Sequence, residues 1–269
     1  MRACAPVIGL LSDFGTRDWY VGTVKAVLLS RCPTARLVDI THEIPPQDTL
    51  AGAFTLAAAA PWFPAGSVLL AVVDPGVGTD RAILAGRADD CWLVGPDNGL
   101  LALTLARAKR VSLVRVTNRR FWPSTVSQTF HARDIMAPAA AALASGCALR
   151  TLGPAVRQAK ALAWPVVERR GGTVRGQVMH IDAFGNLITN IPTQLVARAV
   201  DRPVVQYKRR RVRVVTSYAA GAPQELMAVG GSLGYLELAV RDGSAAWMCH
   251  AVRGDDVVVT DAPRAHGRG

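Results

Sequence analysis

The sequence lacks any pair of cysteines spaced closely enough to hold a metal ion or to act as a redox couple. Its five cysteines are odd in number and far apart, which predicts neither a zinc cluster nor a disulfide framework. The five histidines are equally dispersed, without the helical spacing that is typical of metal ligands. We therefore expect no metal site, and free thiols fit a cytoplasmic location.

Long apolar runs are also missing. The chain has no stretch of about 18 apolar residues, so a transmembrane helix is not expected. Its first residues lead directly into a strand-like segment at 7–11, without the apolar segment and cleavage site of a signal peptide. The sequence therefore predicts a protein that has no membrane partner.

Acidic residues are outnumbered, with 20 aspartates and glutamates against 31 lysines and arginines and a net charge of +11. Such an excess can attract nucleic acid. The densest basic run, residues 208–213, leads into alternating valines, which is the pattern of a half-exposed strand with solvated charges. Because no aromatic-rich basic strand accompanies the charge, we do not expect a nucleic-acid partner.

The composition is that of a globular chain, with 50% hydrophobic and 19% charged residues. Strand-like runs alternate with helical patterns as far as residue 160. The expected strands are 7–11, 37–40, 68–73, 82–86, 91–94 and 111–116. The expected helices are 18–30, capped by Asp18, one that starts near Asp48 and stops before Pro61, 100–108, and one that ends at Ala144. This alternation predicts an α/β domain over residues 1–160, in which helices flank a mostly parallel sheet.

The pattern changes after a linker at about residues 161–172. Short strand candidates then follow one another, separated by glycine, proline and aspartate. They cover 173–181, 204–207, 212–216, 233–240, 246–251 and 257–260. The sequence therefore predicts a second, smaller domain over residues 173–269 that is all-β and barrel-like.

Polar side chains follow several of the expected strands of the first domain. Asp13, His42, Asp74 and Asp97 each come just after a strand end. Because the carboxyl ends of parallel strands share one edge of a sheet, we expect these four groups to converge on one pocket. Arg81 returns after a Pro-Gly-Val-Gly turn, so its guanidinium can meet Asp74 there. A structural ion pair that only fixes the loop is an open alternative.

Two other polar stretches have both a functional and a structural interpretation. His131 lies on the loop that leads into the last helix of the first domain, where a binding role and a structural role remain open. Asp182, Phe184 and Asn186 lie around a turn in the second domain. A carboxamide beside an aromatic ring suits purine recognition, and an ordinary hairpin turn is the alternative.

Five motifs in this order resemble those of the S-adenosylmethionine hydrolases, also called S-adenosylmethionine hydroxide adenosyltransferases, which are related to fluorinating and chlorinating enzymes. The motifs are 11–15, 73–78, 95–99, 129–131 and 182–190. The resemblance covers nearly the whole chain. Two positions depart from it: Ala132 stands where glycine is usual after the histidine, and Gly231 stands where asparagine is usual before Ser232.

The resemblance implies a catalytic set of Asp74, Arg81 and His131, a homotrimer with sites at subunit junctions, and no cofactor. It implies that S-adenosylmethionine is hydrolysed to adenosine and L-methionine by an activated water that attacks the 5′ carbon of the ribose. The leaving methionine is a neutral thioether, so the reaction needs no general acid. The residue that accepts the proton stays unassigned, although an arginine beside an aspartate weakens that carboxylate as a base.

The resemblance also implies a set of substrate-binding residues. These are Asp13 for the ribose hydroxyls, Asp18 and Asp182 for the methionine amine, Phe184 and Asn186 for the adenine, and Ser232, Glu237 and Val240 on a second substrate loop.

Two other functions remain open. A halide-dependent adenosyl transferase would share most motifs, but Arg81 and His131 argue against that branch. A non-catalytic protein that binds adenosine or S-adenosylmethionine is the alternative from a different class. A methyltransferase is disfavoured, because no Gly-x-Gly-x-x-Gly fingerprint follows the first strand.

Overall fold

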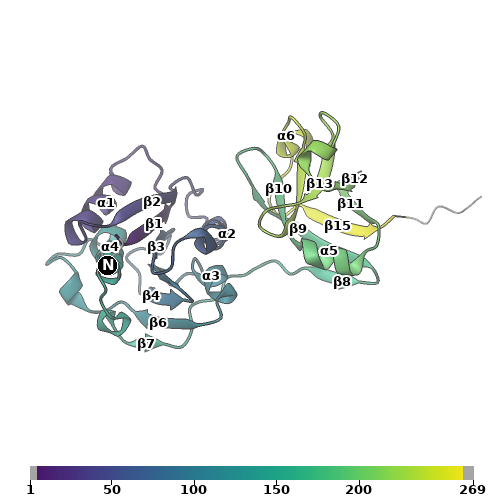
Figure 1. Cartoon of the computed structure of the whole chain (residues 1–269). Coiled ribbons are helices and arrows are strands. Elements are labelled where there is room, and N and C mark those ends of the chain that lie inside the picture. Colours follow the sequence, from purple (N-terminus) through teal and green to yellow (C-terminus); the bar gives the residue numbers. More distant parts are fainter. Residues whose placement is uncertain (1–4, 263–269) are drawn as a thin grey trace, which may run out of the picture. The chain divides into compact units, whose positions relative to one another are not determined.

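A computed structural model describes residues 5–262 of the chain. The chain divides into two compact units, Met1–Leu162 and Ala163–Gly269, here called the N-terminal and the C-terminal unit (Figure 1). Within the described residues, no helix is both long enough and apolar enough to span a membrane.

The N-terminal unit contains a seven-stranded sheet with the order β2-β1-β3-β5-β4-β6-β7. Its strands are β1 (Val7–Ser12), β2 (Arg36–Thr41), β3 (Val68–Val72), β4 (Ile83–Ala88), β5 (Cys91–Pro96), β6 (Val111–Arg115) and β7 (Ala155–Val156). β2, β1, β3 and β5 pair in parallel, whereas β4 runs antiparallel between β5 and β6, and β7 is antiparallel to β6. The predicted mostly parallel sheet is confirmed.

Helices cover both faces of this sheet (Figure 1). They are α1 (Tyr20–Arg31), α2 (Thr49–Ala59), α3 (Ala102–Arg107) and α4 (Ala137–Ala144), with short turns at Ala60–Trp62, Arg119–Phe121, Ala132–Met136 and Leu149–Leu152. The predicted cap of α1 is wrong. The cap position falls on Trp19, whose backbone is already helical, and no side chain caps the helix there. Asp18 lies one residue too early for that role.

The buried strand β3 divides the hydrophobic core into two layers. Val68, Leu70 and Val72 belong to a cluster with residues of α1 and α4, whereas Leu69 and Ala71 belong to a cluster with residues of α2. This alternation follows from the two-residue period of a strand. Both faces of β3 are buried. Polar groups can therefore follow this strand only beyond its last residue, at the sheet edge.

The C-terminal unit is a closed barrel of seven strands. The order is β10-β14-β13-β12-β11-β15-β9, pairing between β9 and β10 closes the ring, and β8 extends it beside β9. The strands are β8 (Glu168–Arg170), β9 (Thr173–Ile181), β10 (Leu187–Pro192), β11 (Pro203–Tyr207), β12 (Arg210–Val215), β13 (Leu226–Gly230), β14 (Tyr235–Val240) and β15 (Asp256–Asp261). The predicted barrel is confirmed.

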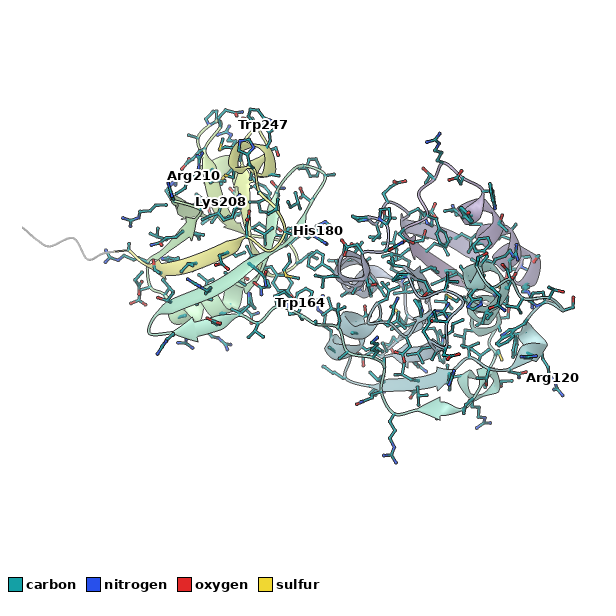
Figure 2. All side chains as sticks on the ribbon, turned by 180° about the vertical axis from the view of Figure 1, so that it is seen from behind. Arg120, Trp164, His180, Lys208, Arg210 and Trp247 are labelled. Atoms are coloured by element: carbon teal, nitrogen blue, oxygen red, sulfur yellow. The ribbon has the colours of Figure 1, made fainter. Side chains whose placement is uncertain are left out.

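Two short helices, α5 (Thr193–Ala199) and α6 (Ala245–Cys249), and a turn at Tyr218–Ala220 complete this unit. The strand predicted at 246–251 is wrong, because most of that segment forms α6. The Ser244 side chain caps this helix by accepting a hydrogen bond from the Trp247 amide. Trp247 itself is highly exposed on α6 (Figure 2). β10 and β13 were not predicted as strands.

Asn190 fastens the barrel where β9 meets β10. Its buried carboxamide accepts a hydrogen bond from the Gln177 amide at 2.8 Å and donates one to the Pro165 carbonyl at 2.9 Å. We expect Asn190→Ala to lower the free energy of unfolding by about 1–3 kcal/mol, because it leaves buried polar groups without partners. Urea denaturation followed by circular dichroism checks this, with Gln206→Ala at an exposed position of β11 as the control. An unchanged midpoint would contradict the assigned role.

Candidate active site

Asp74 follows β3 at the sheet edge, and the chain then reverses through residues 75–80. Gly78 has a φ of +82°, and a Cβ atom there would lie 2.6 Å from the Gln128 carbonyl oxygen. The turn therefore requires glycine. It returns Arg81 beside Asp74, where Nε donates to Oδ1 at 2.7 Å and Nη2 donates to Oδ2. The side chains of Arg81 and Asp74 are only 11% and 6% exposed, respectively.

His131 completes this cluster from the other side. It lies at the start of the π-helical turn Ala132–Met136 and is buried. Its Nδ1 lies 2.9 Å from Arg81 Nη2. Because a guanidinium can only donate, Nδ1 accepts, and the neutral ring then carries its proton on Nε2. Arg81 thus pairs with the carboxylate of Asp74 and fixes the tautomer of His131.

The surroundings of His131 disfavour its charged form. Burial lowers the pKa of His131 below its usual value, and the charge of Arg81 acts in the same direction. The carboxylates of Asp74 and Asp134 oppose this shift without reversing it. The imidazole therefore stays neutral at neutral pH and offers a hydrogen-bond donor at Nε2.

Asp74 and His131 line a cavity of about 400 Å³, which lies in the size range of small-molecule sites. Three aromatic rings form part of its wall. The ring centroid of Tyr20 lies 5.7 Å from that of Phe14 and 5.2 Å from that of Phe130. The cavity therefore combines an apolar wall with a few converging polar groups.

Asp13 also lines this cavity, directly after β1. One oxygen of its carboxylate, Oδ2, accepts the Gln47 amide proton at 2.8 Å. An ionised carboxylate has about four acceptor positions, so Asp13 keeps capacity for the hydroxyls of a ligand.

The prediction that four strand-end groups converge is only half correct. His42 is buried behind the edge, where its ring contacts Ser12 and Asp39. Asp97 accepts the Lys160 amide proton at 2.6 Å and so holds the returning chain. Neither residue lines the cavity. A strand end fixes the place of the backbone, whereas neighbouring loops decide where the side chain goes.

Sequence reasoning missed Asn98, which braces this edge. Its carboxamide donates to the Val73 carbonyl at 2.8 Å, and its oxygen accepts the Leu100 amide proton. The motif at 95–99 therefore supports the residue before Asp74. Only the place of Asn98 in that motif could have indicated it.

The segment 182–186 in the C-terminal unit has the geometry of a hairpin turn. Asp182 Oδ1 accepts the amide protons of Phe184 and Asn186, and Oδ2 accepts the carboxamide of Asn186 at 2.9 Å. The Asp182 carboxylate thus stabilises the turn, and Phe184 at its tip is 78% exposed. In the N-terminal unit, Asp18 is exposed in the segment before α1.

Glu237 is a buried carboxylate of β14 with an unpredicted partner. The Tyr218 hydroxyl donates to its Oε2 at 2.8 Å. Burial raises the pKa of Glu237, and the charge of Asp182 raises it further. Burial followed by the Glu237 bond raises the pKa of Tyr218 to about 12. No sequence spacing indicated this pair, because the residues lie 19 positions apart in unrelated elements.

The loop predicted to be the second substrate loop joins β13 to β14. A Cβ atom on Gly231 would lie 1.8 Å from Glu237 Oε1, so glycine at this position leaves room for the carboxylate. Any side chain at position 231 would require the Glu237 side chain to move. Ser232 is exposed on the loop, and Val240 is buried at the end of β14.

Both units match the models of one protein family. The model of the SAM hydroxide adenosyltransferase N-terminal domain matches residues 8–153, and that of the C-terminal domain matches residues 176–258. The chain belongs to the SAM hydroxide adenosyltransferase family.

Individual relatives agree with this assignment. A protein of Salinispora tropica named (R)-S-adenosyl-L-methionine hydrolase is 40% identical over 96% of this chain and 99% of its own. A protein of the same name from Thermus thermophilus is 42% identical over 87% of this chain and 92% of its own. A fluorinase of an Actinoplanes species is more distant, with 31% identity over 69% of this chain and 72% of its own. A crystal structure of an uncharacterized conserved protein from Thermotoga maritima superposes with a TM-score of 0.89 at 33% identity, covering 94% of this chain and 99% of that one.

The contact between Arg81 and His131 can be tested by titration. We expect Arg81→Met to raise the pKa of His131, because the substitution removes a positive charge and leaves the carboxylate of Asp74 in place. NMR titration of the His131 ring measures this, with Arg120→Met as the control. Arg120 lies at the surface of the N-terminal unit (Figure 2). An unchanged or lower pKa would show that Arg81 does not act on the imidazole.

Proposed function

We propose that this chain hydrolyses S-adenosylmethionine to adenosine and L-methionine through attack of an activated water on the 5′ carbon of the ribose. The observation that carries the proposal is the bridge from Asp74 through Arg81 to His131 beside a cavity of about 400 Å³. Relatives that match over nearly their full length and carry the name of this hydrolase add support.

The substrate determines what the protein has to supply. The 5′ carbon bears a positive sulfonium, and attack there expels methionine as a neutral thioether. No leaving-group acid is needed. The site has to hold one water in line with the breaking bond, help to remove its proton and exclude other solvent.

The three proposed catalytic residues divide these tasks by their hydrogen-bonding capacity. Arg81 has no acceptor atom, and His131 gives its only acceptor nitrogen to Arg81. Asp74 is the one member with acceptor capacity left, so it takes the hydrogen bond of the water. His131 donates through Nε2 to the water oxygen, and the Arg81 charge favours the hydroxide that forms.

The remaining predicted residues bind the substrate. Asp13 accepts from the ribose hydroxyls, and the aromatic wall of the cavity excludes water. In the C-terminal unit, Phe184 and Asn186 face the adenine. The methionine amine is held by Asp18 and Asp182, and the second substrate loop contributes Ser232, Glu237 and Val240. No cofactor takes part, and the cysteine usage supports a cytoplasmic location.

The proposed working form is a homotrimer in which the C-terminal unit of one subunit serves the N-terminal unit of the next. The proposal is supported by the division of the substrate-binding residues between the two units. Sedimentation equilibrium of the full chain tests it. We expect three times the mass of 28.6 kDa, and a monomer with full activity would contradict the shared site.

Product analysis tests the reaction itself. The purified chain is incubated with S-adenosylmethionine, with and without chloride, and the nucleosides are separated by chromatography. We expect adenosine and methionine under both conditions. A 5′-chloro nucleoside would move the chain to the halogenase branch. Tight adenosine binding without any product would leave a non-catalytic binding protein.

Variants assign the chemistry to the bridge. We expect His131→Ala and Arg81→Ala each to lower kcat by about 100-fold or more, because each removes a preorganised group at the reacting water. Arg120→Ala, an arginine removed at the surface, should leave kcat unchanged. Hydrolysis at the normal rate in either bridge variant would overturn the assignment.

A further inference from the structure

His42 is a buried histidine that the proposed reaction does not use. Its ring is joined to two side chains, with 2.7 Å between Nδ1 and Ser12 Oγ and 3.0 Å between Nε2 and Asp39 Oδ1. Lys25 donates to the other oxygen of Asp39 at 2.6 Å. Ser12 Oγ in turn accepts the Phe14 amide proton at 3.3 Å. The four contacts form a continuous chain from Phe14 to Lys25.

The direction of each hydrogen bond in this network follows from its two terminal groups, the Phe14 amide and the Lys25 ammonium. The Asp39 carboxylate only accepts, because bonds from Lys25 and His42 outweigh burial and lower its pKa. In a singly protonated His42 ring the proton therefore lies on Nε2, and Nδ1 accepts the hydroxyl proton of Ser12. The lone pairs of Ser12 remain for the Phe14 amide. Each of the four contacts therefore pairs one donor with one acceptor.

The order serine, histidine, aspartate is also that of a hydrolase triad, but this geometry excludes nucleophilic catalysis. Ser12 is 2% exposed and His42 is 6% exposed. The cavity that they line has a volume of about 10 Å³. That is room for a single water at most, so no substrate reaches the hydroxyl.

The network instead ties the loop after β1, which carries Asp13, to the loop after β2. The Gly15 amide donates to the His42 carbonyl at 2.7 Å, and the Gln47 amide donates to the Asp13 carboxylate at 2.8 Å. Asp13 thus lies between Ser12 and Phe14, which are both held through the His42 ring. Asp13 and Phe14 line the cavity, whereas His42 does not.

We infer that His42 is a positioning residue for nucleoside binding: through Ser12 it fixes the loop that presents Asp13 and Phe14 to the ribose. The nucleoside as ligand rests on the proposed function. His42 touches no substrate, so its loss acts on affinity through Asp13 and spares the attack on the 5′ carbon.

A double-mutant cycle with adenosine tests this inference on the full chain. Isothermal titration calorimetry measures the dissociation constant for Ser12→Ala, Asp13→Ala and the double variant. We expect Ser12→Ala to weaken adenosine binding by about tenfold, the loss of roughly one positioning hydrogen bond. In the Asp13→Ala background the same change should have no further effect, because the residue being positioned is gone.

Two variants separate positioning from a loss of folding. Ser67→Ala removes an equally buried serine hydroxyl, which bonds to the Pro64 carbonyl at the opposite edge of the sheet, and should leave adenosine binding unchanged. Asp39→Asn keeps an acceptor for His42 Nε2 and should bind adenosine nearly as well as the unchanged chain, whereas Asp39→Ala should resemble Ser12→Ala. In turnover, Ser12→Ala should raise KM and spare kcat.

Several outcomes would overturn the inference. One is unchanged adenosine affinity in Ser12→Ala, and another is additive losses in the double variant. Failure of the unchanged chain to bind adenosine would overturn it together with the role of Asp13. A chain that binds adenosine and shows the expected double-mutant cycle, but does not hydrolyse S-adenosylmethionine, would overturn only the proposed function. The positioning role would then remain supported.

Discussion

The guanidinium of Arg81 is the group on which the N-terminal cavity depends. It is nearly buried, and it donates to a buried carboxylate and to a buried imidazole at once. Without it the carboxylate of Asp74 would be an unpaired buried charge, which is among the costliest arrangements in a protein interior. The same contacts decide the chemistry. They pair the carboxylate of Asp74 and set the tautomer of His131, and they leave one acceptor and one donor for a water.

The loops around this bridge are held by side chains that never reach the cavity. Asn98 holds the end of β3 before Asp74, and the His42 network holds the loop around Asp13. Fixed geometry matters because in-line attack tolerates little misplacement of the nucleophile. The positions of the cavity residues at the sheet edge thus depend on hydrogen bonds from side chains that do not line the cavity. In the C-terminal unit, Tyr218 supports Glu237 in the same way.

The sequence predicted best where backbone periodicity controls the outcome. The alternation of strands and helices and the seven-residue return from Asp74 to Arg81 both follow from chain geometry. Predictions from the sequence were wrong where packing determines the position of a side chain. The His42 ring, for example, lies behind the sheet edge and not in the cavity. Residues 246–251 looked like a strand because an alanine-rich turn of helix is too short to show its period. The contact of Tyr218 with Glu237 depends on barrel closure, which local sequence does not encode.

In the proposed reaction, a water held by Asp74, Arg81 and His131 attacks the 5′ carbon of the ribose. The most direct measurement is hydrolysis of S-adenosylmethionine in ¹⁸O-labelled water, with mass spectrometry of both products. We expect the label to enter the 5′ oxygen of adenosine and methionine to stay unlabelled. Unlabelled adenosine would show that the 5′ oxygen does not come from water, and labelled homoserine with 5′-methylthioadenosine would place the attack on the methionine side chain. Either result would contradict the proposed reaction.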